Sequence, residues 1–519
     1  MANLNYLLSR RKTALSRKKN WEPILQKAYR YSQPNRNVLD ARSMGTGGSG
    51  RESDGQNLNW YVFDNTLSHA TDIYVNRMVN GMVPAGKKWL KFAPGTSIPE
   101  NMREEIELKL HNNTEMFFKY IHESNFQLVI GECFYDLVVS TGFMVINRGF
   151  EDKSKIIFAS MPVDKTYAAE GPYGSFDAYF RDWHRLPRDH AKVMWPGIVL
   201  PALQPGDEDK PEMHELEIYE IIYKDYDDGL WHQVLVNEKN NMIMLDLTHA
   251  ASPMIGFRAK KLSDEVYGRG PAMDAYPSAG TINQAMFDEI MSANFRALPM
   301  YMGFGDGVFN PNNFRMVPNT ILSCSPVTSG TWPLQPVPAA GDINFGSIVI
   351  NDLREQINKI MMADPLGAPD DPRKTATEII ERQREVAENA SATYSRIQRE
   401  LFDPLVDRVI EIMRQNGDWL DPVVDGKLIS VVYETPLVIS QGQKEVLDFL
   451  NFDSYNKQVF GVEASSGFYK MEEITPWMAT KLNIDPTLVK NTGEIIETFQ
   501  MVAEQQAMMQ QQEQQQGAA

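Results

Sequence analysis

A glycine-rich stretch near the amino terminus is the first candidate for chemistry. Residues Gly45–Glu52 (GTGGSGRE) have the glycine spacing of a phosphate-binding loop, in which backbone N–H groups hold phosphate oxygens. Such a loop needs Lys and then Ser or Thr for phosphate and magnesium, but Arg51 and Glu52 stand there. No strand-like sequence leads into the loop. We therefore predict a flexible surface loop over Met44–Gly55, with a nucleotide-dependent enzyme as the less favoured alternative.

Metal chemistry has little support from the spacing of the histidines. His184 and His190 are six residues apart around Pro187, so they share no helical face, and none of the 8 histidines forms a His-Glu-x-x-His motif. Two acidic pairs are predicted to form turns first and to bind metal only second. These pairs are Asp227-Asp228 and Asp370-Asp371. We expect no metal site and no cofactor.

Nucleophilic catalysis is also disfavoured. The chain has no Gly-x-Ser-x-Gly elbow, and Cys133 lies in an apolar helical pattern typical of a core position. Cys133 and Cys324 are the 2 cysteines, which excludes a disulfide framework and predicts a reducing compartment. These patterns favour a protein that is not an enzyme.

Composition predicts a folded, acidic protein. Of the 519 residues, 43% are hydrophobic and 23% are charged, and the net charge is −17. The average surface therefore repels phosphate. The first thirty residues are the exception, because eight Lys and Arg residues face only Glu22. We interpret this basic segment first as a solvated face, and second as a grip on an acidic neighbouring subunit or capsid protein.

No segment has the length of a membrane span. The longest apolar stretch, Leu137–Ile146, covers ten residues, about half of the roughly 20 that a membrane helix needs. The charges of the amino-terminal segment follow its apolar residues, the reverse of a secretory signal. We expect a cytoplasmic, non-membrane protein.

Periodicity predicts an α+β fold in which helices predominate. At roughly 150 residues per domain, the length corresponds to about three structural units. Apolar residues at helical spacing predict helices over the ranges 1–36, 63–83, 104–123, 280–297 and 348–362, and a further helix that begins near Asn125. Strands are predicted around residues 137–146 and 156–158. The Glu215–Leu245 segment reads as short β strands with an Asp-Asp-Gly turn. LISVVYETPLVI is strand-like, and a Gln- and Met-rich tail ends the chain.

The longest helical pattern runs from Thr375 to Gln415. Pro404 lacks the N–H that would bond to Glu400, so we predict that the proline kinks or divides this helix. Gly417 is a natural carboxyl-terminal stop.

The most distinctive segments all resemble one family. They follow in order as FDNTLSHATDIYVNRMVNGMVPAGKKWLKF from Phe63, SNFQLVIGECFYDLVVSTGFMVI from Ser124, SPMIGFRAKKLSDEVYGRGPAMDAYPSAGTIN from Ser252 and DPRKTATEIIERQREVAE from Asp371, with YETPLVISQGQKE behind them. Over roughly residues 21–445 this order resembles the head-to-tail connector, or portal, proteins of short-tailed bacteriophages (podoviruses).

The resemblance implies a ring of about twelve copies at one capsid vertex. Double-stranded DNA would pass through the ring without sequence preference during packaging and ejection. The terminase motor, tail adaptor proteins, and the major capsid and scaffolding proteins would be its partners. Assembly is expected in the host bacterial cytoplasm, with the ring then part of the virion.

The portal fold implied by the resemblance divides the chain into a wing, a stem, a clip and a crown. The expected ranges are 1–180 for the amino-terminal wing, 181–200 for the first stem segment, 201–268 for a β-rich clip, 269–298 for the second stem helix, 299–416 for the rest of the wing, and 417–519 for the crown and tail. Within the wing, a channel-facing tunnel loop over 364–374 would precede the long helix over 375–416. The first stem segment was expected at Trp183–Trp195, interrupted by Pro187.

A ring that passes DNA must not bind it tightly, because every phosphate contact with a basic side chain increases the affinity for DNA and slows its movement. The net negative charge of the chain disfavours tight DNA binding, and a few rings of Lys or Arg side chains around the channel could centre the duplex. We expect Arg373 and Lys374 to form such a ring, beside Asp364, Asp370 and Asp371. Equally, the Asp370-Asp371-Pro372 sequence could simply cap the following helix.

Two glycines are predicted to form the joint between clip and stem. Gly268 and Gly270 flank Arg269, and Pro271 suits the first turn of a helix. The alternative is an ordinary helix-entry turn. A monomeric scaffold with a Gln-rich interaction tail is a third class of function that the sequence leaves open.

Overall fold

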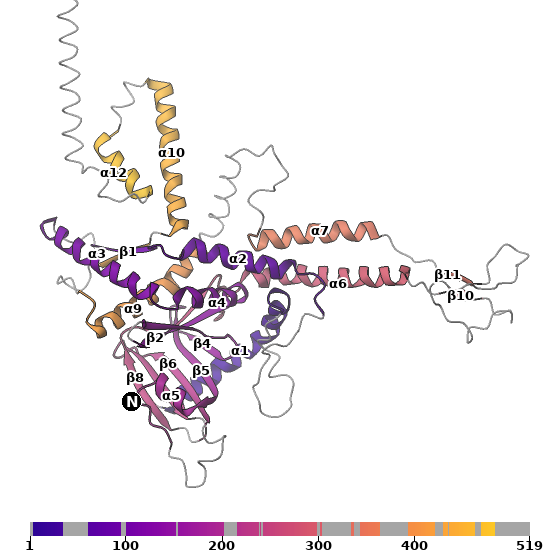
Figure 1. The fold of residues 1–519 in the computed structure, drawn as a ribbon, viewed down its shortest axis with the longest axis horizontal. Helices are drawn as coiled ribbons and strands as arrows, with labels where there is room; N and C mark the ends of the chain where they lie inside the picture. Colours follow the sequence, from indigo (N-terminus) through magenta and orange to yellow (C-terminus); the bar gives the residue numbers. More distant parts are fainter. Residues whose placement is uncertain are drawn as a thin grey trace, which may run out of the picture. The chain divides into compact units, whose positions relative to one another are not determined.

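A computed structural model of the chain describes residues 4–34, 61–94, 100–151, 154–201, 215–237, 239, 242–297, 301–303, 334–336, 343–363, 393–420, 429–433, 435–461 and 469–482. The described residues form a mixed α and β structure, as the periodicity predicts (Figure 1). None of the helices in these ranges combines the length and the apolar composition of a membrane span. The Gly45–Glu52 loop, Cys324 and the carboxyl-terminal tail lie outside the described residues.

The chain divides into two compact units, where length alone predicts about three. Unit 1 comprises Met1–Ser16, Val75–Gly268 and Pro365–Ala519, and unit 2 comprises Arg17–Tyr74 and Arg269–Asp364. The chain therefore passes from unit 1 to unit 2 between Gly268 and Arg269, within the segment predicted to be a joint.

Unit 1 contains two β-sheets that carry most of its architecture. One sheet has the order β3-β2-β9 and the other the order β4-β5-β6-β7-β8, and all neighbours are antiparallel. The strands are β2 (Thr141–Glu151), β3 (Ser154–Ser160), β4 (Thr166–Glu170), β5 (Phe176–Pro187), β6 (Glu215–Lys224), β7 (Trp231–Asn237), β8 (Ile243–His249) and β9 (Met254–Arg258). The predicted pairing of the two early strands is confirmed, with Ile146 opposite Phe158.

Helices complete unit 1. The predicted helices are present as α3 (Glu100–His122) and α4 (Phe126–Val139), and the carboxyl-terminal part contains α10 (Pro436–Phe460) and α12 (Met471–Leu482). A two-stranded sheet joins β1 (Leu90–Pro94) to β12 (Ile429–Tyr433). Strand structure in the LISVVYETPLVI segment ends at Tyr433, because Pro436 starts α10 and suits a first helical turn.

The first half of α1 (Leu4–Ser32) packs on the five-stranded sheet. Leu7 and Ala14 are 2% exposed and share a core cluster with Phe180, Ile221 and Val236. The predicted end of this helix near Pro34 is confirmed. The amino-terminal helix therefore belongs to the core of unit 1 up to Ser16.

The segment predicted as a stem, Trp183–Trp195, begins as the end of strand β5 and continues as the short helix α5 (Arg188–Met194). Trp183 pairs with Ile218 of β6, so this segment and strands β6, β7 and β8 of the predicted clip belong to one sheet with β4, whereas β9 belongs to the sheet of β2 and β3. Pairing between strands, rather than a helical stripe, organises this region. The division into wing, stem and clip concerns an assembled ring and stays a prediction.

Unit 2 is built on a helical hairpin. Helix α6 (Pro271–Ala297) packs against α7 (Ile343–Ile360), the elements predicted as the second stem helix and as the 348–362 helix (Figure 1). Helix α2 (Thr66–Met82) begins in unit 2 and ends before Pro84 and a turn in which Gly86 has φ of 71°. A short hairpin pairs β10 (Tyr301–Gly303) with β11 (Leu334–Pro336).

The long helical pattern is described from residue 393 onward. Directly before Pro404 the regular α-helix is interrupted by a π-helical turn, η5 (Gln398–Phe402), which is followed at once by α9 (Asp403–Asn416). The N–H of Asp403 donates to the carbonyl of Gln398, five residues back. The wider turn thus continues the helix past a residue that has no N–H. Gly417 ends α9 with φ of 76°, as predicted.

Candidate functional site

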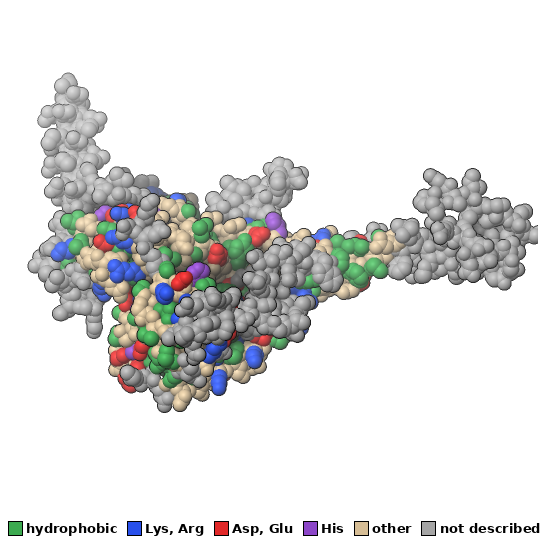
Figure 2. Space-filling view, turned by 60° about the horizontal axis from the view of Figure 1, so that its bottom comes forward, with side chains coloured by type: hydrophobic (Ala, Val, Ile, Leu, Met, Phe, Trp, Pro, Cys, Tyr) green, Lys and Arg blue, Asp and Glu red, His purple; other side chains and the backbone are tan. Residues whose placement is uncertain are grey.

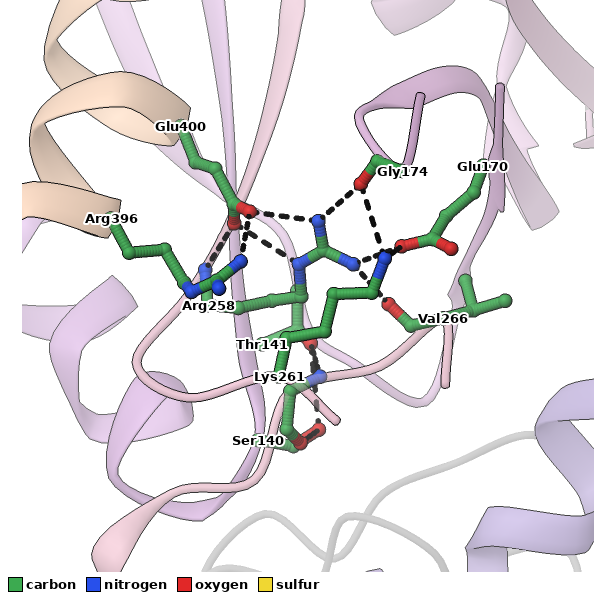
Figure 3. Close-up of polar contacts among 10 residues, drawn as sticks. Ser140, Thr141, Glu170, Gly174, Arg258, Lys261, Val266, Arg396 and Glu400 are labelled. Carbon is green, nitrogen blue, oxygen red and sulfur yellow. Dashed lines mark hydrogen bonds and ion pairs between the residues drawn. The ribbon is translucent and has the colours of Figure 1, made fainter. Parts of the chain in front are cut away.

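A buried arginine connects three parts of unit 1 beside the predicted joint. Arg258, the last residue of β9, is 0% exposed. Its backbone N and its Nε both donate to Glu400 Oε2 at 3.0 Å, and its Nη2 donates to Glu400 Oε1 at 2.8 Å. The guanidinium also forms an ion pair with Glu170, the last residue of β4 (Figure 3). We call Arg258, Glu170 and Glu400 the Arg258 network.

Backbone carbonyls complete the shell of the guanidinium. Nη2 donates to the carbonyl of Gly174 at 2.9 Å, and Nη1 donates to the carbonyl of Val266 at 2.8 Å. The ring of Phe176 lies 4.2 Å from the guanidinium carbon. Because the N–H groups of a buried guanidinium must be paired, this shell fixes the turn after β4 and the segment before Gly268 against the same side chain.

The π-helical turn supplies the acceptor for Arg258. Glu400 lies within η5, and its carboxylate also accepts a hydrogen bond from Arg396 at 3.1 Å. Glu170 in turn pairs with Lys261. Burial alone would lower the pKa of Arg258, but the hydrogen bonds and charges of Glu400 and Glu170 outweigh it and raise that pKa. The guanidinium is therefore a permanent cation inside the fold.

Gly268 is packed tightly against the network. A Cβ atom at this position would lie 2.8 Å from the Ser140 carbonyl oxygen and 2.8 Å from the Arg258 Cβ. The N–H of Gly268 donates to Thr141 Oγ1 at 2.9 Å, and its carbonyl accepts from Ser140 Oγ at 2.9 Å. Neither Gly268 nor Gly270 has a positive φ. Close approach within the chain, and not an unusual backbone sign, is thus the reason for glycine at position 268.

The other residues of the predicted joint belong to unit 2. The Arg269 guanidinium lies 5.2 Å from the ring centroid of Trp21, and Pro271 is the first residue of α6. Proline at that position is favoured because its fixed φ suits a helix start. The Arg258 network and the tight contact at Gly268 therefore hold the chain at the point where it leaves unit 1.

Comparison with known proteins shows the family of the chain. A family model described as "Bacteriophage head to tail connecting protein" matches residues 4–489. The chain belongs to this family of head-to-tail connectors. Among solved structures, the chain is similar to one titled "Neck of empty GTA particle computed with C6 symmetry", with 12% identity, 86% of this chain and 99% of that chain covered, and a TM-score of 0.35. No curated protein matches the chain.

Membership gives the connector a structural role in joining the head and the tail of a bacteriophage particle. The residues of the predicted tunnel loop, Asp364, Asp370, Asp371, Arg373 and Lys374, lie outside the described residues, as does the Thr375–Arg382 motif. Their placement stays a prediction.

The acidic pair Asp227-Asp228 is part of a turn in the connector, as predicted. The Asp228 carboxylate accepts from the N–H of Leu230 at 2.8 Å, and Gly229 has φ of 74°. Ligand atoms of Asp225, Asp228 and His232 lie within 4.8 Å of one another. The backbone N–H groups of the turn and the His232 ring already use these carboxylates, so the cluster is explained without a metal.

Other predicted chemistry residues are placed separately. Cys133 is 0% exposed in the core, and its Sγ donates to the carbonyl of Phe143 at 3.3 Å, which confirms its structural position. His184 lies in strand β5 and His190 in helix α5.

The amino-terminal basic segment is only partly a solvated face. Arg11 forms a two-pronged ion pair with Asp182, at 2.9 and 2.6 Å, and Arg10 pairs with Asp177 at 2.9 Å. Burial opposes the charge of Arg11, but its hydrogen bond to Asp182 raises its pKa. Lys12, Arg17, Lys19, Lys27 and Arg30 are exposed. The first turns of α1 thus use their arginines to dock on the connector's own sheet.

Sequence reasoning missed the Arg258 network. Arg258 and Glu400 are 142 positions apart, and no periodicity relates them. The available signal was the arginine that ends an otherwise apolar strand, MIGFR, within a segment that resembles the family. A charge at the buried end of a strand requires a partner elsewhere in the fold.

Proposed function

We propose that this connector is a portal of the podovirus type: a ring of about twelve copies at one capsid vertex that forms the channel for DNA packaging and ejection. The observation that supports this most is the family match over residues 4–489, nearly the whole chain. The ring would also be the docking platform for the terminase motor, tail adaptor proteins, and the major capsid and scaffolding proteins.

The charge balance supports a conduit that does not retain DNA. The chain carries −17, and on the face seen in Figure 2 acidic and basic side chains are interspersed over the described residues. Such a surface lacks the concentrated basic field that grips a duplex. Within the ring we propose that Arg373 and Lys374, beside Asp364, Asp370 and Asp371, face the channel as a centring ring.

The portal proposal is tested on the purified full chain. Light scattering should give a mass near twelve times 59.0 kDa, and negative-stain end views should show a central opening. Double-stranded DNA should not bind tightly to the particle at physiological salt. A stable monomer that turns over ATP, or a particle without an opening, would contradict the proposal.

The tunnel-loop proposal has its own test. Neutralising Arg373 and Lys374 together should impair DNA packaging or retention in assembled particles while rings still form. The matched control is Lys12→Gln with Arg17→Gln, two exposed basic residues of α1. Unchanged packaging and retention in the tunnel-loop variant would exclude the centring role.

We further propose that Gly268, Arg269, Gly270 and Pro271 form the joint from clip to stem. Replacing Gly268 and Gly270 by valine should block ring assembly, since a side chain at Gly268 meets Ser140 and Arg258. The control is Gly131→Ala, where a Cβ meets nothing within 4 Å. Normal rings from the double valine variant would remove the joint from the proposal.

A further inference from the structure

A groove with basic side chains that have no ion pair to a described carboxylate lies within unit 2; the guanidinium of one of them, Arg30, lies 5.0 Å from the ring centroid of Tyr61. It has a volume of about 690 Å³ and lies between the second half of α1 and the first half of α6. Lys27, Arg30 and Tyr31 line it from α1, and Tyr276 and Gly280 are among the residues that line it from α6. Lys27 and Arg30 are exposed, and in the described part of the chain neither is paired with a carboxylate. We call this the α1–α6 groove.

The exposed face of α7 has the complementary charges. Val349, Asp352 and Glu355 follow one another at intervals of three residues, so they form one stripe along the helix. Val349 is 42% exposed, and Asp352 and Glu355 are exposed without ion pairs to other described residues. Lys359 continues the stripe one turn later, while the groove contains Asp288. We call Val349, Asp352, Glu355 and Lys359 the α7 stripe.

The fold of unit 2 presents the α7 stripe outward. Ile350 and Ile357 are 4% and 0% exposed on the inner face of α7, and Arg354 forms an ion pair with Asp64 at 2.6 Å. Arg354 Nη2 also contacts Met286 Sδ of α6 at 4.0 Å. These contacts hold α7 on one side, and the stripe has no ion pair to the residues of unit 2 that the structure describes.

Helical geometry separates the stripe from the groove within one copy. On α6, Met286 meets α7 and Ile282 is buried, whereas Tyr276, Gly280 and Gln284 line the groove. At 100° per residue these two sets lie on opposite faces of α6. The acidic stripe and the basic groove of the same chain therefore face in different directions, and a second copy could bring the two surfaces together.

We infer that the α7 stripe of one copy docks in the α1–α6 groove of the next copy in the ring. Asp352 and Glu355 meet Lys27 and Arg30, Lys359 meets Asp288, and Val349 lies against the aromatic lining of the groove. Different surfaces on the two partners make a head-to-tail contact, the kind that closes into a ring when the rotation permits. This inference rests on the proposed ring and names the surfaces that join its copies.

Charge reversal tests the interface in the full-length protein. K27E/R30E makes the groove acidic, and D352K/E355K makes the stripe basic. In each variant alone, the groove of one copy and the stripe of the next carry charges of the same sign and repel each other. Each variant alone should therefore lose the high-mass ring in light scattering. Mixed in equal amounts, the two should restore rings of alternating copies with an even number of subunits, because every groove then meets a stripe of opposite charge. K12E/R17E, on the exposed surface of α1 outside the groove, should form rings normally.

The mixture also controls for folding, since misfolded chains cannot rescue one another. If wild-type protein forms rings and both reversed variants do so equally well, the interface inference fails and the portal proposal stands. If the variants fail to assemble alone and also fail when mixed, these charges do not meet and the inference fails. If K27E/R30E assembles but loses affinity for DNA, the groove is a phosphate site and the inference fails. A wild-type monomer would instead overturn the portal proposal itself.

Discussion

The buried charges of unit 1 and a set of surface charges of unit 2 have different surroundings in the connector. In unit 1 two buried cations have carboxylate partners within the same chain: Arg258 pairs with Glu400, and Arg11 pairs with Asp182. In unit 2 Lys27 and Arg30 on one surface, and Asp352 and Glu355 on another, have no ion pair among the described residues. Unit 2 also contains an internal ion pair between Arg354 and Asp64, so the contrast is between the buried pairs of unit 1 and these surface charges of unit 2.

This difference separates stability from assembly. A buried pair contributes to folding because removal of one partner leaves an uncompensated charge in the interior. An exposed unpaired charge contributes almost nothing to folding but can select a partner and its orientation. Substitutions in the buried ion pairs of unit 1 should therefore lower stability, and substitutions in the groove or stripe of unit 2 should change the assembly while leaving the fold unchanged.

The largest effect is expected from Arg258→Met. It leaves Glu400 and Glu170 without their buried cation, and loss of one partner of such a pair costs about 3–5 kcal/mol of folding free energy. Urea unfolding of the purified protein measures this loss. Arg148→Met, an exposed position on β2, is the matched control and should change stability little. A loss as small as that of the control would show that the Arg258 network does not stabilise unit 1.

A pH dependence of intermediate size is expected from His249. Burial, aided by the nearby Arg408 guanidinium, lowers the pKa of His249 to about 4 from an ordinary value of 6.5, against the opposing charge of Glu411. The unfolded chain therefore binds a proton between these values that the folded chain does not. Stability should fall as the pH is lowered from 6.5 to about 4 and then level off.

The His249 prediction is measured as the urea midpoint against pH for wild type and His249→Gln. The variant should lose part of the slope of stability against pH.

His232 in the same sheet should have the opposite effect on that slope. The hydrogen bonds and charges of Asp228 and Asp246 outweigh burial and raise the pKa of His232, so His232→Gln is measured separately. His190→Gln, at an exposed position of α5, is the neutral control. Equal slopes for wild type and His249→Gln would show that His249 is not held neutral by the fold.

The smallest effect on folding is expected from K27E/R30E. Surface substitutions of this kind change folding free energy by at most about 0.5 kcal/mol. Urea unfolding at a protein concentration where all variants are monomeric measures this, because assembly itself would add stability. A large loss of monomer stability would mean that Lys27 and Arg30 support unit 2 internally, and the contrast between the two units would disappear.

Local patterns predicted the elements well where burial repeats along a single segment. The spacing of apolar residues predicted α2, α3, α4 and α6, and Gly417 predicted the end of α9. Alternation predicted β2 and β3 as partners. In each case the signal lies within one helix face or one strand, so no knowledge of distant residues is required.

The remaining features depend on contacts between distant residues. The strand over Trp183–Pro187 is stabilised by its ladder to β6, which the local proline did not reveal. Gly268 is glycine because Ser140 and Arg258 approach it, and nothing near Gly268 in the sequence shows this. The Arg258 network joins residues from β4, β9 and η5, so it could not be read from any one segment.

The π-helical turn at Gln398–Phe402 has one residue more than an ordinary helical turn requires. Deletion of one residue there would give a regular helix, with the preceding turns rotated by about 100° relative to α9. Such a shortened chain would keep its helical content and still contain Glu400, yet the carboxylate would point away from Arg258. The one extra residue of η5 thus sets the direction in which the side chains of the preceding helical turn point relative to those of α9.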